Sequence, residues 1–273
     1  MWTRLLSLDR RWVFVAIGLA VAAPFLLNFA LPPGAVNPQT QKVFDIIEHA
    51  RRGEVLLIAY DYGPSTAAEL HPMALALTRH ALKRGMRVIA MTIDLQGTLM
   101  ADDVLGRMTR EMPDKRDGVD FVNLGFKVGD ILVITGLGED FRRTYVRDAR
   151  GRLTRTLKAL DGVRNYGNVR LTVDLSSSDT PFSWVLFAHE KYGARLAAGV
   201  TAVMATDVYP YLQTDQLCGL LNGMRGAAEY EALIRHPDKA MQGMTAQSLG
   251  HLAIVLLVIL GNLAHFATRR GRP

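Results

Sequence analysis

Two long apolar runs, one near each end of the chain, constrain the fold more than any other feature. The first covers residues 12–31 and the second covers residues 248–267, and neither contains Asp, Glu, Lys or Arg. A helix of about 20 residues crosses about 30 Å of hydrocarbon. Both runs are therefore predicted to be transmembrane helices, with the lipid bilayer as their surroundings.

A cleaved signal peptide is the alternative interpretation of the first run. The apolar core of such peptides is usually about 7–15 residues long, which is shorter than this run. The small residues Ala22 and Ala23 also lie too early to form a cleavage site. An uncleaved anchor is therefore the favoured interpretation.

The arginines beside the two runs predict the orientation. Six of them flank the runs on the terminal sides, against the single acidic residue Asp9. Cationic flanks stay on the cytoplasmic side of a membrane. The predicted order is a cytoplasmic N-terminus (1–11), a span (12–31), a periplasmic domain (32–247), a span (248–267) and a cytoplasmic basic tail (268–273). The membrane would then be the inner, or cytoplasmic, membrane of a bacterium.

The positive charge of the chain belongs to these flanks and not to the domain. The chain has a formal charge of +6, but outside the six flanking arginines and Asp9 it holds 26 Lys or Arg and 25 Asp or Glu. Such a balance leaves no excess of cations to neutralise a phosphate backbone. We therefore expect no binding of nucleic acid.

Between the spans, short apolar runs alternate with helical patterns. Continuous runs of this kind are typical of parallel strands that are covered on both faces. The sequence thus predicts an α/β fold, a doubly wound, mostly parallel and Rossmann-like sheet of five strands. The five predicted strands are residues 55–61, 87–94, 119–125, 169–175 and 200–207.

Three further segments of the domain carry expectations of their own. Residues 130–145 are predicted to be helical, as are residues 214–235. Thr180 is expected to be the N-cap of another helix that begins at Pro181. The arginine-rich segment 146–167 is either a solvated loop or a contact surface for a neighbouring subunit or anionic lipid.

Polar residues follow the predicted strands where each one ends. In an open parallel sheet, ligands bind outside the carboxyl ends of the strands. The same residue types also cap helices and form turns, which is the alternative to a ligand or catalytic role. The candidate ligand-binding residues are Asp61, Tyr62, Asp94, Asp174, Ser176, Ser177, Ser178 and Asp207.

No known catalytic motif is present in the sequence. The chain lacks the nucleophile elbow, the phosphate-binding loop, the H-E-x-x-H pair and the C-x-x-C pair. Its single cysteine, Cys218, has no second thiol in the chain for an internal disulfide. We therefore assign no catalytic residue and expect no cofactor, while the sequence leaves a metal site undecided.

Small and polar residues in the predicted spans indicate close helix packing. Gly18 and Ala22 form a small-xxx-small pair in the first span, and Gly261 and Asn262 lie in the second. Small residues let helices approach, and an asparagine can form a hydrogen bond across them. Asn28 and Asn262 are the candidates for such bonds.

The stretch from Ile58 to Thr92 resembles the extracytoplasmic auxiliary domains of ABC-type systems, of the GldG-like kind. Three later stretches, residues 119–129, 173–193 and 198–231, look like a group of uncharacterised bacterial two-span membrane proteins. The likeness spans most of residues 53–235. It implies a component of a membrane complex and supplies no catalytic residue.

Two functions are consistent with the sequence. The first is a membrane-anchored α/β subunit that scaffolds or assists a larger homo- or hetero-oligomeric assembly, with transport as one possible setting. The alternative is a sensor or enzyme that binds a small ligand at the carboxyl ends of the strands.

The orientation can be tested with a reporter enzyme that is active only outside the cytoplasm. We expect activity when the reporter is inserted in segment 146–167 and none when it is fused after Pro273, because the arginines hold both termini inside. Activity at Pro273 without activity in the loop would reverse the predicted topology.

Overall fold

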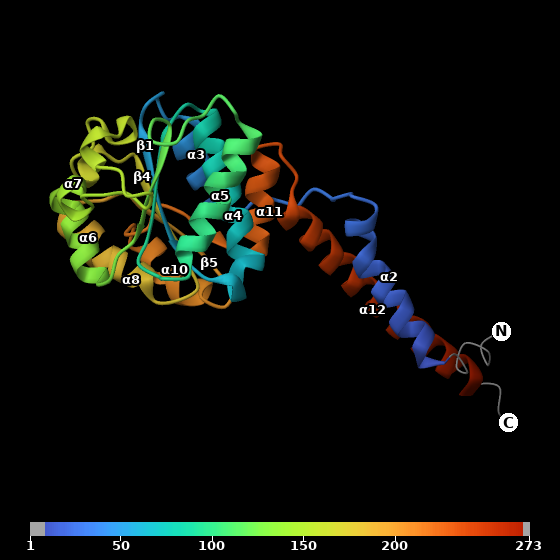
Figure 1. Ribbon diagram of the computed structural model, residues 1–273. Helices are drawn as coiled ribbons and strands as arrows, with labels where there is room; N and C mark the ends of the chain where they lie inside the picture. Colours follow the sequence, from blue (N-terminus) through green and yellow to red (C-terminus); the bar gives the residue numbers. More distant parts are fainter. Residues whose placement is uncertain (1–8, 270–273) are drawn as a thin grey trace.

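The domain is built on a parallel sheet of six strands, and the computed structural model describes residues 9–269 (Figure 1). The strand order is β3-β2-β1-β4-β5-β6, so the chain winds outward from β1 in one direction and from β4 in the other. All neighbouring strands pair in parallel, which places all carboxyl ends at one edge. The strands are β1 (Val55–Asp61), β2 (Arg87–Thr92), β3 (Phe121–Phe126), β4 (Leu171–Ser176), β5 (Leu196–Val200) and β6 (Leu220–Asn222).

Helices cover both faces of this sheet. Every residue of β1 is buried, and its side chains alternate between the two cores. One face packs against α3 (Pro38–Glu48), α4 (Ala67–Lys83), α5 (Gly97–Glu111) and α11 (Gly223–Leu233). The other packs against α6 (Asp130–Glu139), α7 (Phe141–Thr144), α8 (Thr180–Trp184), a π-helical turn (Val185–His189) and α10 (Ala205–Gln213). The short α9 (Glu190–Tyr192) follows the π-helical turn.

The α/β class, the parallel sheet and the Rossmann-like order are confirmed, whereas the prediction of five strands is wrong. The sixth strand, β6, lies inside the predicted helix 214–235. It has only three residues and is bounded by Gly219 and by Gly223, whose φ is +55°. A run this short gives almost no periodic signal. The predicted helix begins only after it, at Gly223.

The fifth predicted strand was placed too late in the chain. The observed β5 ends at Val200, and most of the predicted run belongs to the following turn and to α10. Ala205 and Val208 are buried, while Val203 and Asp207 are exposed. Burial at this spacing of three residues suits one face of a helix and not a strand.

The arginine-rich connection 146–167 is more ordered than a solvated loop. It forms three short 3-10 helices: Thr154–Thr156, Lys158–Leu160 and Tyr166–Asn168. Leu157, Leu160 and Tyr166 are buried in the second core. Its arginines therefore lie on a fixed surface.

A helical hairpin leaves the domain beside α11 (Figure 1). Its two members, α2 (Arg10–Leu26) and α12 (Lys239–Arg269), run side by side. Within residues 9–269, α12 is the one helix whose length and hydropathy suit a membrane span, over Lys239–Ala267. The prediction of two such helices is thus not met, because α2 stops at Leu26 and Asn28 adopts a positive φ of 49°.

The predicted packing residues of the hairpin are only partly correct. A Cβ added to Gly18 or Gly261 would meet nothing within 4 Å, so these glycines do not form the contact between the helices. Gly250 does, because its added Cβ would lie 3.0 Å from Val21. Asn28 accepts a hydrogen bond of 2.6 Å from Gln242 of α12, whereas Asn262 is exposed.

Two buried glutamates of α11 bind the start of α3 and the start of α12, where the chain passes between the hairpin and the domain. Glu229 accepts hydrogen bonds from the Asn37 amide and the Thr40 hydroxyl, at the start of α3. Glu231 accepts three backbone N–H groups at the start of α12, those of residues 238, 240 and 241, at 2.9–3.1 Å. These bonds satisfy amides that a helix start leaves without partners.

The Glu231 contact yields a prediction about stability. Replacing Glu231 with Ala leaves three N–H groups, two of them buried, without an acceptor, so we expect the free energy of unfolding to fall by about 2–3 kcal/mol. The exposed Glu139→Ala variant should stay within about 0.5 kcal/mol of the wild type. Denaturant unfolding of the detergent-solubilised chain, followed by circular dichroism, measures both. Equal losses would contradict the role given to Glu231.

Candidate functional site

The carboxyl edge of the sheet brings together two buried aspartates at the switch point between β1 and β4. In the register of these strands, Ala59 faces Asp174 and Asp61 faces Ser176. Side chains two residues apart point to the same face of a sheet. Asp61 and Asp174 are therefore diagonal neighbours on the face covered by α8, and their exposed fractions are 1% and 3%.

Asp61 connects β1 to the end of β2. Its Oδ1 accepts hydrogen bonds from the Ile93 amide at 2.8 Å and from the Thr92 hydroxyl at 3.1 Å. These donors belong to the neighbouring strand and not to the helix that follows β1. A capping role for Asp61 toward its own helix, the alternative expected from sequence, is thus not observed.

Asp174 connects β4 to the start of α8. Its Oδ2 accepts a hydrogen bond of 2.9 Å from the Thr180 hydroxyl, which also lies 2.7 Å from the Ser176 hydroxyl. Thr180 was expected to be an N-cap, but the N-cap is Asp179, without a side-chain bond. The hydroxyl of Thr180 donates its hydrogen bond to Asp174 instead.

Each of the two carboxyl groups has one oxygen left over. Asp61 Oδ2 and Asp174 Oδ1 are buried and form no hydrogen bond. The same is true of the Trp184 indole Nε1. Burial raises the pKa of both aspartates, and the negative charge of Asp61 raises that of Asp174 further. The Trp184 N–H faces Asp61 and acts in the opposite direction on its pKa.

The other predicted residues lie apart from this pair. Tyr62 belongs to the opposite core, where its hydroxyl bonds to His71 at 3.1 Å. Asp94 accepts the Gln96 amide in a local turn. Asp207 is exposed in the first turn of α10.

The serine run after β4 divides in the same way. Ser176 is buried and reaches the pair through Thr180. The Ser178 hydroxyl lies 3.2 Å from that of Ser176 but is exposed, and Ser177 is half-buried. The structure thus unites three of the eight predicted residues: Asp61, Asp174 and Ser176.

Four residues of the site were not predicted as such: Thr92, Tyr145, Thr180 and Trp184. Thr92 could have been found, because it ends β2 two residues before Asp94, the predicted acidic end of that run. Trp184 lies within one turn of the π-helical segment, and such segments are frequent at functional sites. The sequence gives no signal that would place Tyr145 here.

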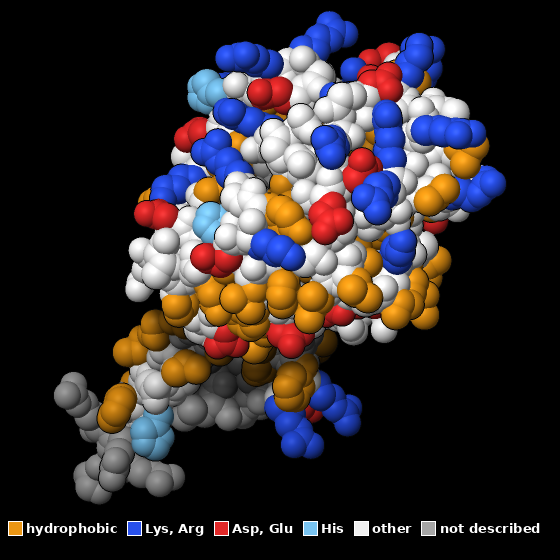
Figure 2. All heavy atoms as spheres, turned by 90° about the vertical axis from the view of Figure 1, so that its left-hand side faces the viewer, with side chains coloured by type: hydrophobic (Ala, Val, Ile, Leu, Met, Phe, Trp, Pro, Cys, Tyr) orange, Lys and Arg blue, Asp and Glu red, His pale blue; other side chains and the backbone are white. Residues whose placement is uncertain are grey.

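Exposed apolar side chains gather on the loops and the first helical turns around the same edge. They follow β2, β3 and β5, and we call them, with the acidic residues between them, the carboxyl rim. Figure 2 shows a band of hydrophobic side chains along the lower part of the domain. The apolar members of the rim are Leu95, Leu99, Val128, Ile131, Leu132 and Val203, and the acidic ones are Asp94, Asp130, Asp179 and Asp207.

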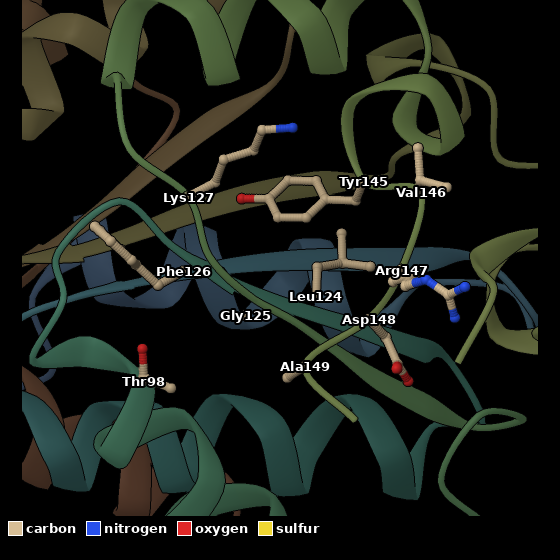
Figure 3. Close-up of a pocket in the computed structure, with 10 residues that line it drawn as sticks. All are labelled: Thr98, Leu124, Gly125, Phe126, Lys127, Tyr145, Val146, Arg147, Asp148 and Ala149. Carbon is tan, nitrogen blue, oxygen red and sulfur yellow. The ribbon is translucent and has the colours of Figure 1, made fainter. Parts of the chain in front are cut away.

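A pocket of about 560 Å³ opens beside the rim, next to the end of β3 (Figure 3). Leu124, Phe126 and Tyr145 give it apolar walls, and Lys127 lies over the Tyr145 ring, 5.4 Å from its centre. The Lys127 ammonium also donates a hydrogen bond to the carbonyl of Thr144. A pocket of this size can hold a small molecule.

The Tyr145 hydroxyl links the pocket to the aspartate pair electrostatically. It is buried without a hydrogen-bond partner, and burial together with the charge of Asp61 raises its pKa. Among residues 9–269, no cluster of three or more His, Cys, Asp or Glu side chains has a geometry suited to a metal ion.

Comparison with known proteins found no match. No protein-family model, curated protein or solved structure matches this chain. The resemblance to GldG-like auxiliary domains therefore stays a prediction from the sequence.

The Thr180 hydroxyl gives a test of the site's hydrogen bonds. Thr180→Val removes a donor from the buried Asp174, so we expect the free energy of unfolding to fall by about 1–3 kcal/mol. Thr180→Ser keeps the hydroxyl and should lose less. The exposed Thr206→Val variant is the control in the same denaturant titration. A Val variant as stable as the Ser variant would show that the Asp174 contact contributes nothing.

Proposed function

We propose that this protein is a membrane-anchored subunit that assembles side by side with further copies of itself. In this proposal α12 spans the cytoplasmic membrane of a bacterium and α2 lies against it within the bilayer. Both termini are cytoplasmic, and the α/β domain stands on the periplasmic side as the scaffold of the assembly. The observation that carries the proposal is a pair of surfaces of opposite charge on one domain.

The carboxyl rim is the acidic surface of this pair. Its six exposed apolar side chains lie among four carboxylates, and the cations Lys127 and Arg143 lie beside Val128 and Leu132. Exposed apolar groups rimmed by polar residues mark interaction sites in soluble domains. In Figure 2 the charged side chains directly below the apolar band are acidic.

The connection 146–167 is the basic surface. Its arginines are held on ordered backbone, and most of them are exposed: Arg147, Arg150, Arg155 and Arg164. Arg87, at the amino end of β2, bonds to the carbonyls of residues 158, 159 and 161. The basic surface therefore extends from the β3 side toward the amino edge, away from most of the carboxyl rim.

Two different, complementary surfaces on one subunit favour a head-to-tail contact. Such contacts close into a ring when the rotation between subunits permits it. Anchoring in a membrane restricts the copies to one plane and one orientation, which lowers the cost of association. A self-contact of the rim alone would place like charges together, so the basic surface of the next copy is its better partner.

Binding of a small ligand at the carboxyl edge is the second candidate function. The pocket beside Tyr145 favours it, because apolar walls beside the two cations Lys127 and Arg147 suit a small anionic or amphiphilic molecule. This candidate does not require assembly. A purified chain that stays monomeric would therefore favour ligand binding over assembly.

Charge reversal tests the head-to-tail contact. In mild detergent we expect the wild type to have a mass that is a multiple of 30.1 kDa. Asp179→Arg with Asp207→Arg should break the assembly, and so should Arg155→Asp with Arg164→Asp. Combining all four changes again gives the two surfaces opposite charges and should restore the mass of the wild-type assembly, measured by light scattering.

The control is Lys83→Asp, an exposed change at the end of α4 that should leave the mass unaltered. A single wild-type chain across several mild detergents would refute the assembly. Failure of the combined variant to recover, while each half is folded, would refute the pairing of these two surfaces.

A further inference from the structure

The aspartate pair holds two loops of the carboxyl rim in place. Asp61 binds the Thr92 hydroxyl and the Ile93 amide, which begin the connection that carries Leu95 and Leu99. Asp174 binds the Thr180 hydroxyl, where the connection from β4 enters α8. The rim loops after β2 and β4 thus depend on adjacent carboxyl groups of β1 and β4.

The surroundings of the pair contain no compensating charge. Neither carboxyl group forms an ion pair with any residue in the described part of the chain. The groups that face it are the Thr92 hydroxyl and Ile93 amide beside β2, the Ser176 hydroxyl of β4, Thr180 and Trp184 of α8, and Tyr145 after α7. Of these only Tyr145 titrates, and its phenol is neutral.

Two ionised aspartates would therefore be adjacent charges in a closed core. The energetic cost of such an arrangement is large, and buried carboxyl pairs relieve it by keeping one proton. One oxygen of each group, Asp61 Oδ2 and Asp174 Oδ1, is buried and accepts no hydrogen bond. A proton on one of them would satisfy both.

We propose that Asp61 and Asp174 form a proton-binding site that controls the carboxyl rim. One proton, held between Asp61 Oδ2 and Asp174 Oδ1, leaves a single negative charge that Thr92, Ile93 and Thr180 can stabilise. Loss of the proton places two negative charges side by side. Their repulsion drives β1 and β4 apart at the edge and releases the loops after β2 and β4.

The direction of the pH dependence follows from burial. An aspartate has a pKa of about 3.9 in an unfolded chain, and burial raises the pKa of both groups in the folded domain. The folded state then binds more protons than the opened state above about pH 4. The closed rim is most stable on the acid side and loses stability as pH rises through the pKa values of the pair.

The test follows the proton and the loops separately in the full chain. Infrared spectroscopy should show a protonated carboxyl at about pH 7, where exposed carboxyl groups are ionised. Raising the pH should remove this band and change the emission of Trp184, read in a Trp2→Phe, Trp12→Phe variant. Absence of the band at about pH 7 would overturn the proposal.

Hydrogen exchange then reads the rim. After correction for intrinsic exchange, the opening constant of residues 93–95 and 176–184 should rise roughly tenfold per pH unit while one proton is lost. In Asp174→Asn only Asp61, whose pKa burial raises to about 6, can release a proton, so the rise should be absent above about pH 7, whereas the exposed Asp207→Asn should behave as the wild type. Equal slopes in the wild type and Asp174→Asn would refute the control of the rim.

Any effect of this proton on assembly through the carboxyl rim rests on the proposed function, whereas the proton site itself does not. A pH-dependent rim in a chain that remains single would refute only the assembly. Assembly that charge reversal breaks and restores, in a chain without the infrared band, would refute only the proton site.

Discussion

The position of β1 between β2 and β4 governs the geometry of the whole domain. Because all strands are parallel, every connection returns to the same edge before the next strand begins. The chain leaves β1 toward β2 and β3, and leaves β4 toward β5 and β6, so the connections diverge at the point between β1 and β4. The two aspartates and the loops that they hold all meet at this switch point.

Sequence patterns predicted the elements with long or continuous apolar runs. Strands β1 to β4 and helices α6 and α7 were predicted near their observed limits. Each strand is a continuous apolar run that is buried on both faces, and the helical segment buries one face. β6 was missed because three residues between two glycines carry no periodicity. β5 was misplaced because the apolar residues of the following turn, among them the exposed Val203, continue the run without being buried.

Only the part of the site that follows from the strand topology could be predicted from the sequence. The rule that strand ends converge brought Asp61, Asp174 and Ser176 into one list. It could not separate them from Asp94 or Tyr62. The face to which a side chain points at a strand end depends on the residue at which strand pairing stops, and the sequence does not show that residue. Thr180, Trp184 and Tyr145 come from other layers, and their convergence is a property of packing that spacing does not encode. For the same reason the sequence could not show that Gly18 and Gly261 lie outside the contact between α2 and α12.

The attachment of the hairpin to α11 has a consequence for the way the domain sits on a membrane. Glu229 and Glu231 lie two residues apart on one helix and hold the start of α3 and the start of α12, so the joint has little freedom to bend. α12, with 31 residues and a length of about 46 Å, is then a lever fixed to the domain. Apolar helices tilt until their length matches the thickness of the bilayer. With α12 across the membrane, as proposed above, a change in lipid thickness would turn the domain together with the helix, and the direction in which the carboxyl edge faces would then follow the thickness of the bilayer.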